Sequence, residues 1–205
     1  MYSADVAEGL RSVGEVEFVQ GLAASSASGV YGTSRAAAGI MGHADLKVGA
    51  DVKPILEALQ AASPNRFRGI RHNITWNNDP TWDNRETEGI VKSAQFIEGA
   101  KVLRDQGLRL DIMQSFPQMT EIAEFAKSVP DLPIIVNHVG GVSRVGIYAD
   151  KDDEIIPKWR EGITALAANP NVTMKLGGLG MPRFGFGWHA REIPIGSEEL
   201  AEAMN

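Results

Sequence analysis

Residues Pro133–Gly141 read PIIVNHVGG, and the rest of the chain is organised around this stretch. The apolar run 134–136 lies between a proline and a glycine-rich loop, a pattern typical of a strand buried on both faces of a parallel sheet. The run ends at Asn137 and His138. A histidine at this position is either a structural residue of the turn or part of an active site, since α/β enzymes carry their chemistry at the carboxyl ends of parallel strands.

Helical and strand-like patterns alternate along the rest of the chain. Residues 51–62 show the clearest amphipathic helix, with Asp51 as its expected N-cap and Pro54 in its first turn. The predicted helices cover residues 13–27, 51–62, 90–106, 117–129, 154–168 and 197–204, and the predicted strands begin near residues 36, 67, 108, 134 and 172.

This alternation predicts an α/β protein with a parallel sheet and right-handed crossovers. The sequence has no GxGxxG after its first predicted strand, no GxxxxGK[ST] and no GxSxG. We therefore expect a (β/α) TIM-barrel fold, and an incomplete one, because about five strands in 205 residues fall short of the eight in a full barrel. One partial-barrel domain over residues 1–205 is expected, and a flavodoxin-like five-stranded domain is the alternative.

The composition is ordinary for a soluble globular protein, with 43% hydrophobic and 22% charged residues. A net charge of −6 without any basic run argues against binding to nucleic acids or anionic membranes. The lack of cysteine excludes disulfides, zinc fingers, iron–sulfur clusters and thiol nucleophiles. No apolar stretch approaches the roughly 18 residues of a membrane span, and no signal-peptide pattern opens the sequence. We therefore expect a cytoplasmic protein whose partner is a small-molecule substrate.

Each predicted strand ends in polar or titratable side chains. The carboxyl ends of the strands build the active site of a barrel, so these side chains are expected to share one pocket. They are His43, Arg71, His72, Asp111, Gln114, Asn137, His138 and Lys175.

Asp111 and Lys175 are informative because each lies within an otherwise apolar strand. A buried unpaired carboxylate would be costly, so Asp111 is expected to face the barrel mouth or to pair with a base such as Arg71. Lys175 is likewise expected to pair with a group in the pocket, either as a partner or as a ligand clamp.

Several segments together resemble the amidohydrolase-2 family of TIM-barrel hydrolases, in particular the branch of the 2-pyrone-4,6-dicarboxylate and sugar-lactone lactonases. The resemblance covers essentially the whole chain. It implies hydrolysis of a lactone, ester or amide, or decarboxylation in related members, at the top of the barrel. The segments are RFRGIRHNITW (66–76), LRLDIMQSFPQM (108–119), a helix ending before Pro130, PIIVNHVGG (133–141) and NVTMKLGGLGM (171–181).

The resemblance also implies roles for individual residues. His138 and His72 would be catalytic, and the histidine and arginine side chains would polarise the carbonyl and hold carboxylates. In metal-dependent members His138 would bind one divalent metal, zinc or manganese, through a neutral nitrogen, whereas the lactonase branch needs none, and both alternatives stay open. With the strand-end residues included, the expected substrate-binding set is Arg71, Asp111, Gln114, Gln118, Lys175 and His43.

Two features of the family are absent from the sequence: the His-x-His of its first strand, and the eighth strand with the Asp that activates water. We therefore expect either a fragment of a longer protein or a short form whose open barrel is closed by a partner chain. Exposed strand edges favour a homo-oligomer, or helices that cover the edges.

Two functions remain open at this point. One is a hydrolase acting on a small carboxylated molecule, with Arg71, His72 and His138 as its site. The other is a catalytically inactive barrel remnant that binds a ligand or serves as a scaffold subunit.

Overall fold

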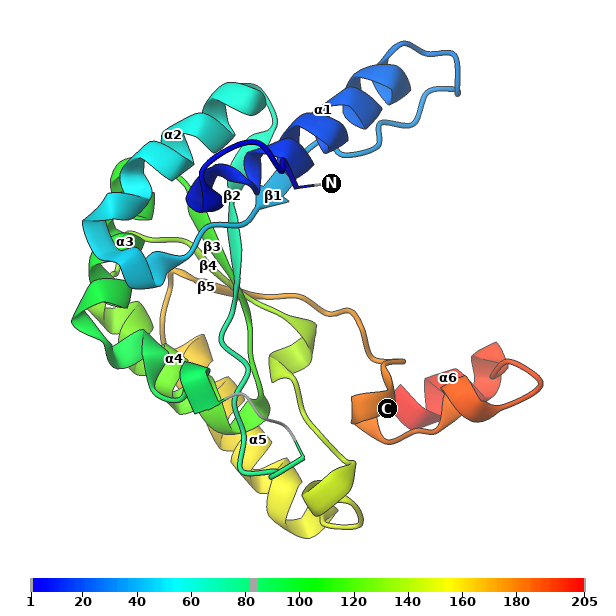
Figure 1. Cartoon of the computed structure of the whole chain (residues 1–205). Helices are drawn as coiled ribbons and strands as arrows, with labels where there is room; N and C mark the ends of the chain where they lie inside the picture. Colours follow the sequence, from blue (N-terminus) through cyan, green and yellow to red (C-terminus); the bar gives the residue numbers. More distant parts are fainter. Residues whose placement is uncertain (1, 82–84, 205) are drawn as a thin grey trace.

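A computed structural model describes residues 2–81 and 85–204 of the chain (Figure 1). Its parallel sheet consists of β1 (Ile40–Gly42), β2 (Phe67–Asn73), β3 (Arg109–Met113), β4 (Ile134–Val136) and β5 (Val172–Met174). The α-helices are α1 (Val13–Ala27), α2 (Lys53–Ala62), α3 (Ala94–Asp105), α4 (Met119–Ser128), α5 (Asp152–Ala167) and α6 (Ser197–Met204). Short 3-10 turns are η1 (Glu8–Leu10), η2 (Leu46–Val52), η3 (Arg85–Thr87), η4 (Ile90–Lys92), η5 (Phe116–Gln118), η6 (His138–Gly140), η7 (Gly146–Tyr148), η8 (Pro182–Phe184) and η9 (Trp188–Ala190).

The strand order distinguishes the two predicted folds. The sheet runs β1-β2-β3-β4-β5, and every neighbouring pair is parallel. A flavodoxin-like sheet would instead place its second strand outside the first. Helices α1 to α5 lie on one side of the sheet, and the opposite side is open and concave (Figure 1). This arrangement is part of a TIM barrel, so the expected fold class is confirmed and the flavodoxin-like alternative is not.

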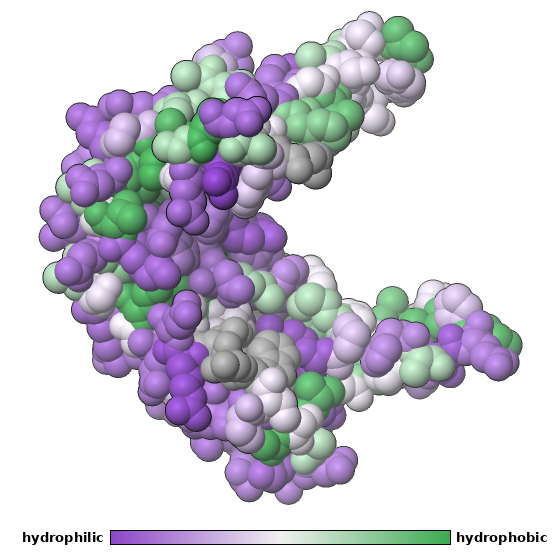
Figure 2. Space-filling view, viewed as in Figure 1, coloured by the Kyte–Doolittle hydropathy of each residue, from purple (hydrophilic) through white to green (hydrophobic). Residues whose placement is uncertain are grey.

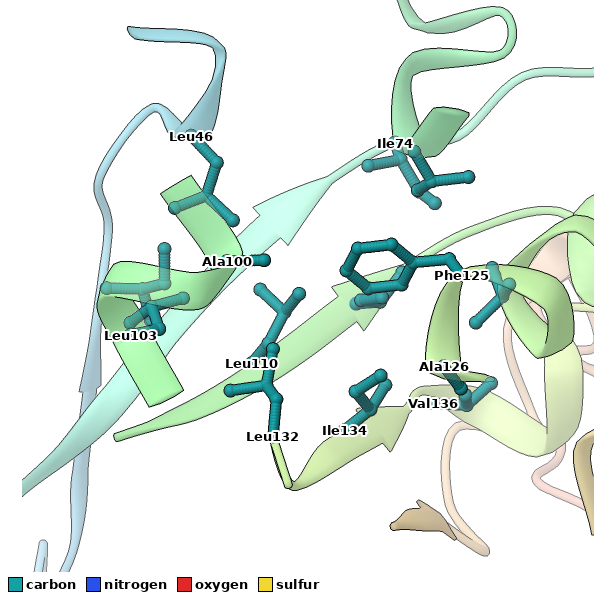
Figure 3. Packing of buried hydrophobic residues seen from close by; sticks show 14 of the residues in the cluster. Leu46, Ile74, Ala100, Leu103, Leu110, Phe125, Ala126, Leu132, Ile134 and Val136 are labelled. Carbon is teal, nitrogen blue, oxygen red and sulfur yellow. The ribbon is translucent and has the colours of Figure 1, made fainter. Parts of the chain in front are cut away.

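The hydrophobic core lies between the sheet and its helices. Successive side chains of a strand point to opposite faces, so alternate residues of each strand enter this layer. Figure 3 shows strand residues packed against side chains from α3 and α4. The fully buried members include Ile70, Leu103, Leu110, Ile112, Ala126, Leu132, Ile134 and Val136.

The predicted helices are all present, with ends that shift by a few residues, but two predictions near the N-terminus are wrong. The first strand begins at Ile40 rather than near residue 36, because residues 36–39 form a turn and pairing with β2 starts only where Ile40 meets Phe67. Asp51 does not cap the second helix, because it lies within η2 and α2 begins only at Lys53.

Beyond β5 the chain leaves the sheet and leads to α6, which lies apart from the other helices (Figure 1). No residue of α6 is buried. Among the described residues, no helix combines the length and the apolar character needed to cross a membrane.

One glycine is required where β2 joins its neighbours. The register between β1 and β2 shifts at this point, since Phe67 pairs with Ile40 and Gly69 pairs with Met41, which leaves one extra residue in β2. On the other side Gly69 pairs with Arg109 of β3. A Cβ atom added to Gly69 would overlap the backbone carbonyl of Arg109. The close approach of these strands therefore depends on the missing side chain.

We predict that Gly69→Ala lowers the free energy of unfolding by about 3 kcal/mol, because the two strands must separate to admit the methyl group. Urea denaturation of the purified variant measures this change. Gly21→Ala is the matched control, since nothing lies within 4 Å of a Cβ at that helical position, and there we expect a gain of up to about 1 kcal/mol. A Gly69→Ala variant as stable as the wild type would contradict the close approach.

Candidate functional site

The open concave face of the sheet carries several of the polar residues that the sequence placed at strand ends. Figure 2 shows the molecule from the side, with hydrophilic residues at the inner end of the hollow. Arg71 of β2 is in register with Asp111 of β3, and both point to this face, where they form an ion pair. The apolar neighbours Ile70 and Leu110 point to the opposite side, into the core. The alternation of the strands thus separates an apolar layer from a polar one.

Asp111 is the centre of a network that joins four neighbouring strands. Its side chain is fully buried, and its carboxylate accepts hydrogen bonds from Arg71 Nε at 3.1 Å and Nη2 at 3.0 Å. Lys175, which follows β5, donates to Oδ2, and Asn137, which follows β4, donates to Oδ1. The predicted pairing of Asp111 with Arg71 is confirmed, and Lys175 also has the partner that the sequence required.

The electrostatics of this network favour anion binding. Burial raises the pKa of the Asp111 carboxyl, but the hydrogen bonds from Arg71, Lys175 and Asn137 outweigh burial and hold the pKa below its usual range. Two cations therefore surround one carboxylate, which leaves a net positive charge in a protein of net charge −6. The side chains of Arg71 and Lys175 are 47% and 39% exposed, so both can meet a ligand from the concave side.

Two buried side-chain amides, those of Asn137 and Gln114, add hydrogen bonds to this network. Asn137 is fully buried and also donates to the carbonyl of Ile112 at 2.8 Å, while its Oδ1 accepts from Arg71 at 3.3 Å. The fully buried Gln114 donates to the Asn137 carbonyl at 2.9 Å. The sequence pattern marked Asn137 only as a polar strand end. Its amide supplies both a donor and an acceptor, which is why it can bridge an acid and a base.

His138 directly follows Asn137 of the network, and its ring has a defined orientation. Its Nδ1 lies 3.1 Å from the carbonyl oxygen of Gly177. A carbonyl only accepts, so the neutral ring carries its proton on Nδ1 and keeps a lone pair on Nε2. The next residue, Val139, donates its backbone N–H to the Lys175 carbonyl at 3.0 Å, which joins the histidine turn to the end of β5. His138 can therefore accept a proton or a metal at Nε2.

His72 lies on the other face of β2 from Arg71, because consecutive residues of a strand point in opposite directions. The ring is 5% exposed and packs edge-on against Phe96 with centroids 5.1 Å apart. Its Nε2 lies 3.3 Å from Asp45 Oδ1. Burial lowers the pKa of His72, and Asp45 offsets only part of this effect. The structure therefore does not bring His72 together with Arg71, although the sequence predicted a shared pocket.

His43 and Arg71 border a cleft on the concave side. The exposed His43 follows β1, and its Nδ1 lies 3.2 Å from the Arg71 carbonyl. The cleft has a volume of about 410 Å³, which is within the range of small-molecule sites. Its other lining residues are Tyr2, Glu15 of α1, Met41, Gly42 and Asn73. A larger hollow of about 690 Å³ lies among the loops at residues 76–80, 85 and 88, and no residue of the Asp111 network lines it.

Gln118 is buried away from the cleft, with its amide engaged by backbone groups. Its Oε1 accepts from the N–H groups of Ser115 at 3.0 Å and Trp76 at 2.9 Å, and its Nε2 donates to the Ile74 carbonyl at 2.7 Å. These bonds tie the start of α4 to the segment after β2. The predicted contact between Gln118 and a substrate stays a prediction.

The described residues do not fit a metal centre. Within 2–81 and 85–204, no three His, Cys, Asp or Glu side chains are grouped closely enough to hold an ion. His138 could offer one nitrogen, but both oxygens of Asp111 already accept hydrogen bonds from Arg71, Lys175 and Asn137.

Comparison with known proteins gives a consistent result. A family profile described as Amidohydrolase matches residues 6–203. The uncharacterized protein y4mH of Sinorhizobium fredii is 32% identical over 167 residues, which are 81% of this chain and 52% of that protein. The L-fucono-1,5-lactonase of Burkholderia multivorans is 25% identical over 114 residues, which are 56% of this chain and 36% of the lactonase.

The fold also matches a solved structure. An amidohydrolase from Burkholderia multivorans, crystallised with bound zinc, superposes with a TM-score of 0.66 at 22% identity. The match covers 92% of this chain and 56% of the other. The chain therefore spans about half the length of the y4mH protein and about half the length of this amidohydrolase.

We predict that Asp111→Asn lowers the free energy of unfolding by about 3 kcal/mol at pH 7, because it leaves two cations facing a neutral amide. Since the folded pKa of Asp111 lies below its ordinary value, this contribution is complete above about pH 4 and is lost as the pH falls through the folded pKa. The difference in free energy of unfolding between the variant and the wild type should therefore become smaller at acid pH.

Urea denaturation at a series of pH values measures both effects. The exposed Asp131→Asn is the control and should leave stability almost unchanged at every pH. If the difference in free energy of unfolding between Asp111→Asn and the wild type stays constant between pH 7 and pH 2, the charge of the Asp111 carboxylate does not contribute to stability.

Proposed function

The chain belongs to the amidohydrolase family, and on that basis we propose that it hydrolyses a lactone, ester or amide bond of a small carboxylated molecule on the concave face of its sheet. The chain spans about half the length of the y4mH protein. The proposal therefore concerns only the chemistry that the residues of this chain can supply. The observation that carries it is the pair of partly exposed cations, Arg71 and Lys175, that are paired with the buried Asp111.

Arg71 and Lys175 supply positive charge where a substrate needs it. Arg71 uses Nε and Nη2 for Asp111 and Asn137, and among the described residues its Nη1 has no hydrogen-bond partner. The Lys175 ammonium donates to Asp111 and has two further protons. These donors are suited to a substrate carboxylate and to the negative charge that develops on a carbonyl oxygen under attack.

His138 supplies the base. Its Nε2 lone pair can take a proton from water while the water oxygen forms a bond to the carbonyl carbon. The bond from that carbon to the ring oxygen of a lactone then breaks, and the leaving oxygen receives the proton. The net reaction is lactone plus water to hydroxy acid. Similarity to the L-fucono-1,5-lactonase supports a lactone as the first substrate class to test.

We predict that His138→Ala lowers kcat/KM for lactone hydrolysis by about 10²- to 10⁴-fold, the usual range for loss of a general base. A pH indicator follows the acid released from a panel of sugar lactones and carboxylated lactones. The exposed His189→Ala is the matched control and should keep wild-type rates. Hydrolysis that is equally fast in His138→Ala would remove this histidine from the mechanism.

Substrate charge provides a separate prediction. A carboxylated lactone should have a KM roughly 10-fold or more below that of its methyl ester, because a hydrogen bond to a charged group contributes about 1.5 to 3 kcal/mol. Arg71→Gln should raise KM for the acid and leave KM for the ester nearly constant. Equal KM values for acid and ester in the wild type would contradict the role of the two cations.

A further inference from the structure

The chain leaves β4 through a turn of unusual handedness. The φ angles of His138 and Val139 are both +50°, and those of Gly140 and Gly141 are +79° and +65°. Gly140 donates to the Asn137 carbonyl at 3.1 Å, and Gly141 donates to the His138 carbonyl at 2.8 Å. These bonds join each residue to the third one before it, so residues 138–141 form one turn of left-handed 3-10 helix.

This turn is strained at its first two residues. Glycine adopts positive φ without steric cost, but other residues do so at a cost, and a β-branched residue such as Val139 is the least suited to it. Such strain persists only where the surrounding structure imposes it, and it is concentrated at functional sites. The contacts of the Val139 peptide should therefore show what imposes the turn.

Both polar groups of Val139 are held by neighbouring elements. Its N–H donates to the Lys175 carbonyl at 3.0 Å, and its carbonyl accepts from Trp159 Nε1 at 2.7 Å. Trp159 belongs to α5 and is half-buried. An indole has a single donor and no acceptor, so this hydrogen bond uses its whole polar capacity. The outer helical layer thus reaches the turn that carries the proposed base.

The turn determines where the His138 ring lies. The ring rests against Gly177 and Gly178: Nδ1 lies 3.1 Å from the Gly177 carbonyl, and a Cβ added to Gly178 would overlap the ring. His138 itself has a φ angle of +50°, and a negative φ at this residue would turn its Cβ atom and its ring away from this position. We infer that Trp159 is a positioning residue, whose hydrogen bond to the strained Val139 peptide holds His138 in the orientation that its proposed role as base requires.

This inference rests on the proposed function, but its structural part can be tested without substrate. Trp159→Phe keeps an aromatic ring and removes the N–H. We expect a nuclear Overhauser contact between the His138 ring and the Gly178 α-protons in the wild type, and its loss in Trp159→Phe. In the hydrolysis assay kcat should fall about 10- to 100-fold with KM nearly constant, since small misplacement of a reacting group costs this much.

Relief of the strain should restore the site. Val139→Gly lets the peptide adopt positive φ freely, so the turn no longer needs the tryptophan. In the Val139→Gly background, Trp159→Phe should therefore lower kcat by less than roughly 3-fold and keep the Overhauser contact. Trp188→Phe is the control, because that indole stacks on Phe186 and, within the described residues, makes no hydrogen bond to the turn.

Three outcomes would overturn the inference. The first is a Trp159→Phe variant that retains the His138–Gly178 contact and its kcat. The second is an equal loss with and without Val139→Gly, which would show that Trp159 only stabilises the fold. The third is the same loss in Trp188→Phe. If no lactone is hydrolysed by the wild type, the proposed function fails while the Overhauser measurements still decide the role of Trp159.

Discussion

One buried carboxylate organises the inner face of this protein. Asp111 is fully buried in the middle strand of an open sheet, where an unpaired charge would be very costly. Its partners come from β2 and from the segments after β4 and β5: Arg71, Asn137 and Lys175. Satisfying one charge therefore aligns the carboxyl ends of four strands. The same contacts hold two partly exposed cations on the concave side, so the fold and the candidate site share a single electrostatic requirement.

One face of the sheet is apolar and the other is polar, because successive side chains of a strand point to opposite faces. Ile70 and Leu110 enter the apolar layer under the helices, while Arg71 and Asp111, the next residue in each strand, face the open side. His72 follows the same rule and lies on the helical side of β2 beside Phe96. A residue that is adjacent in sequence to a site can thus belong to the opposite layer.

Much of this arrangement could be predicted from the sequence. The alternation of helices and strands and the barrel-type fold followed from apolar runs and turn residues, and the pairing of Asp111 with Arg71 followed from the cost of a buried charge. The sequence predicted one pocket that included both Arg71 and His72, but the two side chains lie on opposite faces of β2, because strand-end position does not fix the face on which a side chain lies. The left-handed turn at His138 and Val139 gave no local signal except the two glycines that follow. Its hydrogen bond to Trp159 joins residues 20 apart in sequence, and no pattern predicts such a contact.

If the proposed function is right, the concave face at Asp111 binds the carboxylate of the substrate or product. Titration of isotope-labelled protein with the hydroxy-acid product of the best lactone, followed by NMR, measures this binding. We expect saturable shifts at the backbone amides of Arg71, Asn137, His138 and Lys175, with little change in the loop residues 76–80. Shifts confined to those loop residues, or none at millimolar product, would contradict the proposed binding.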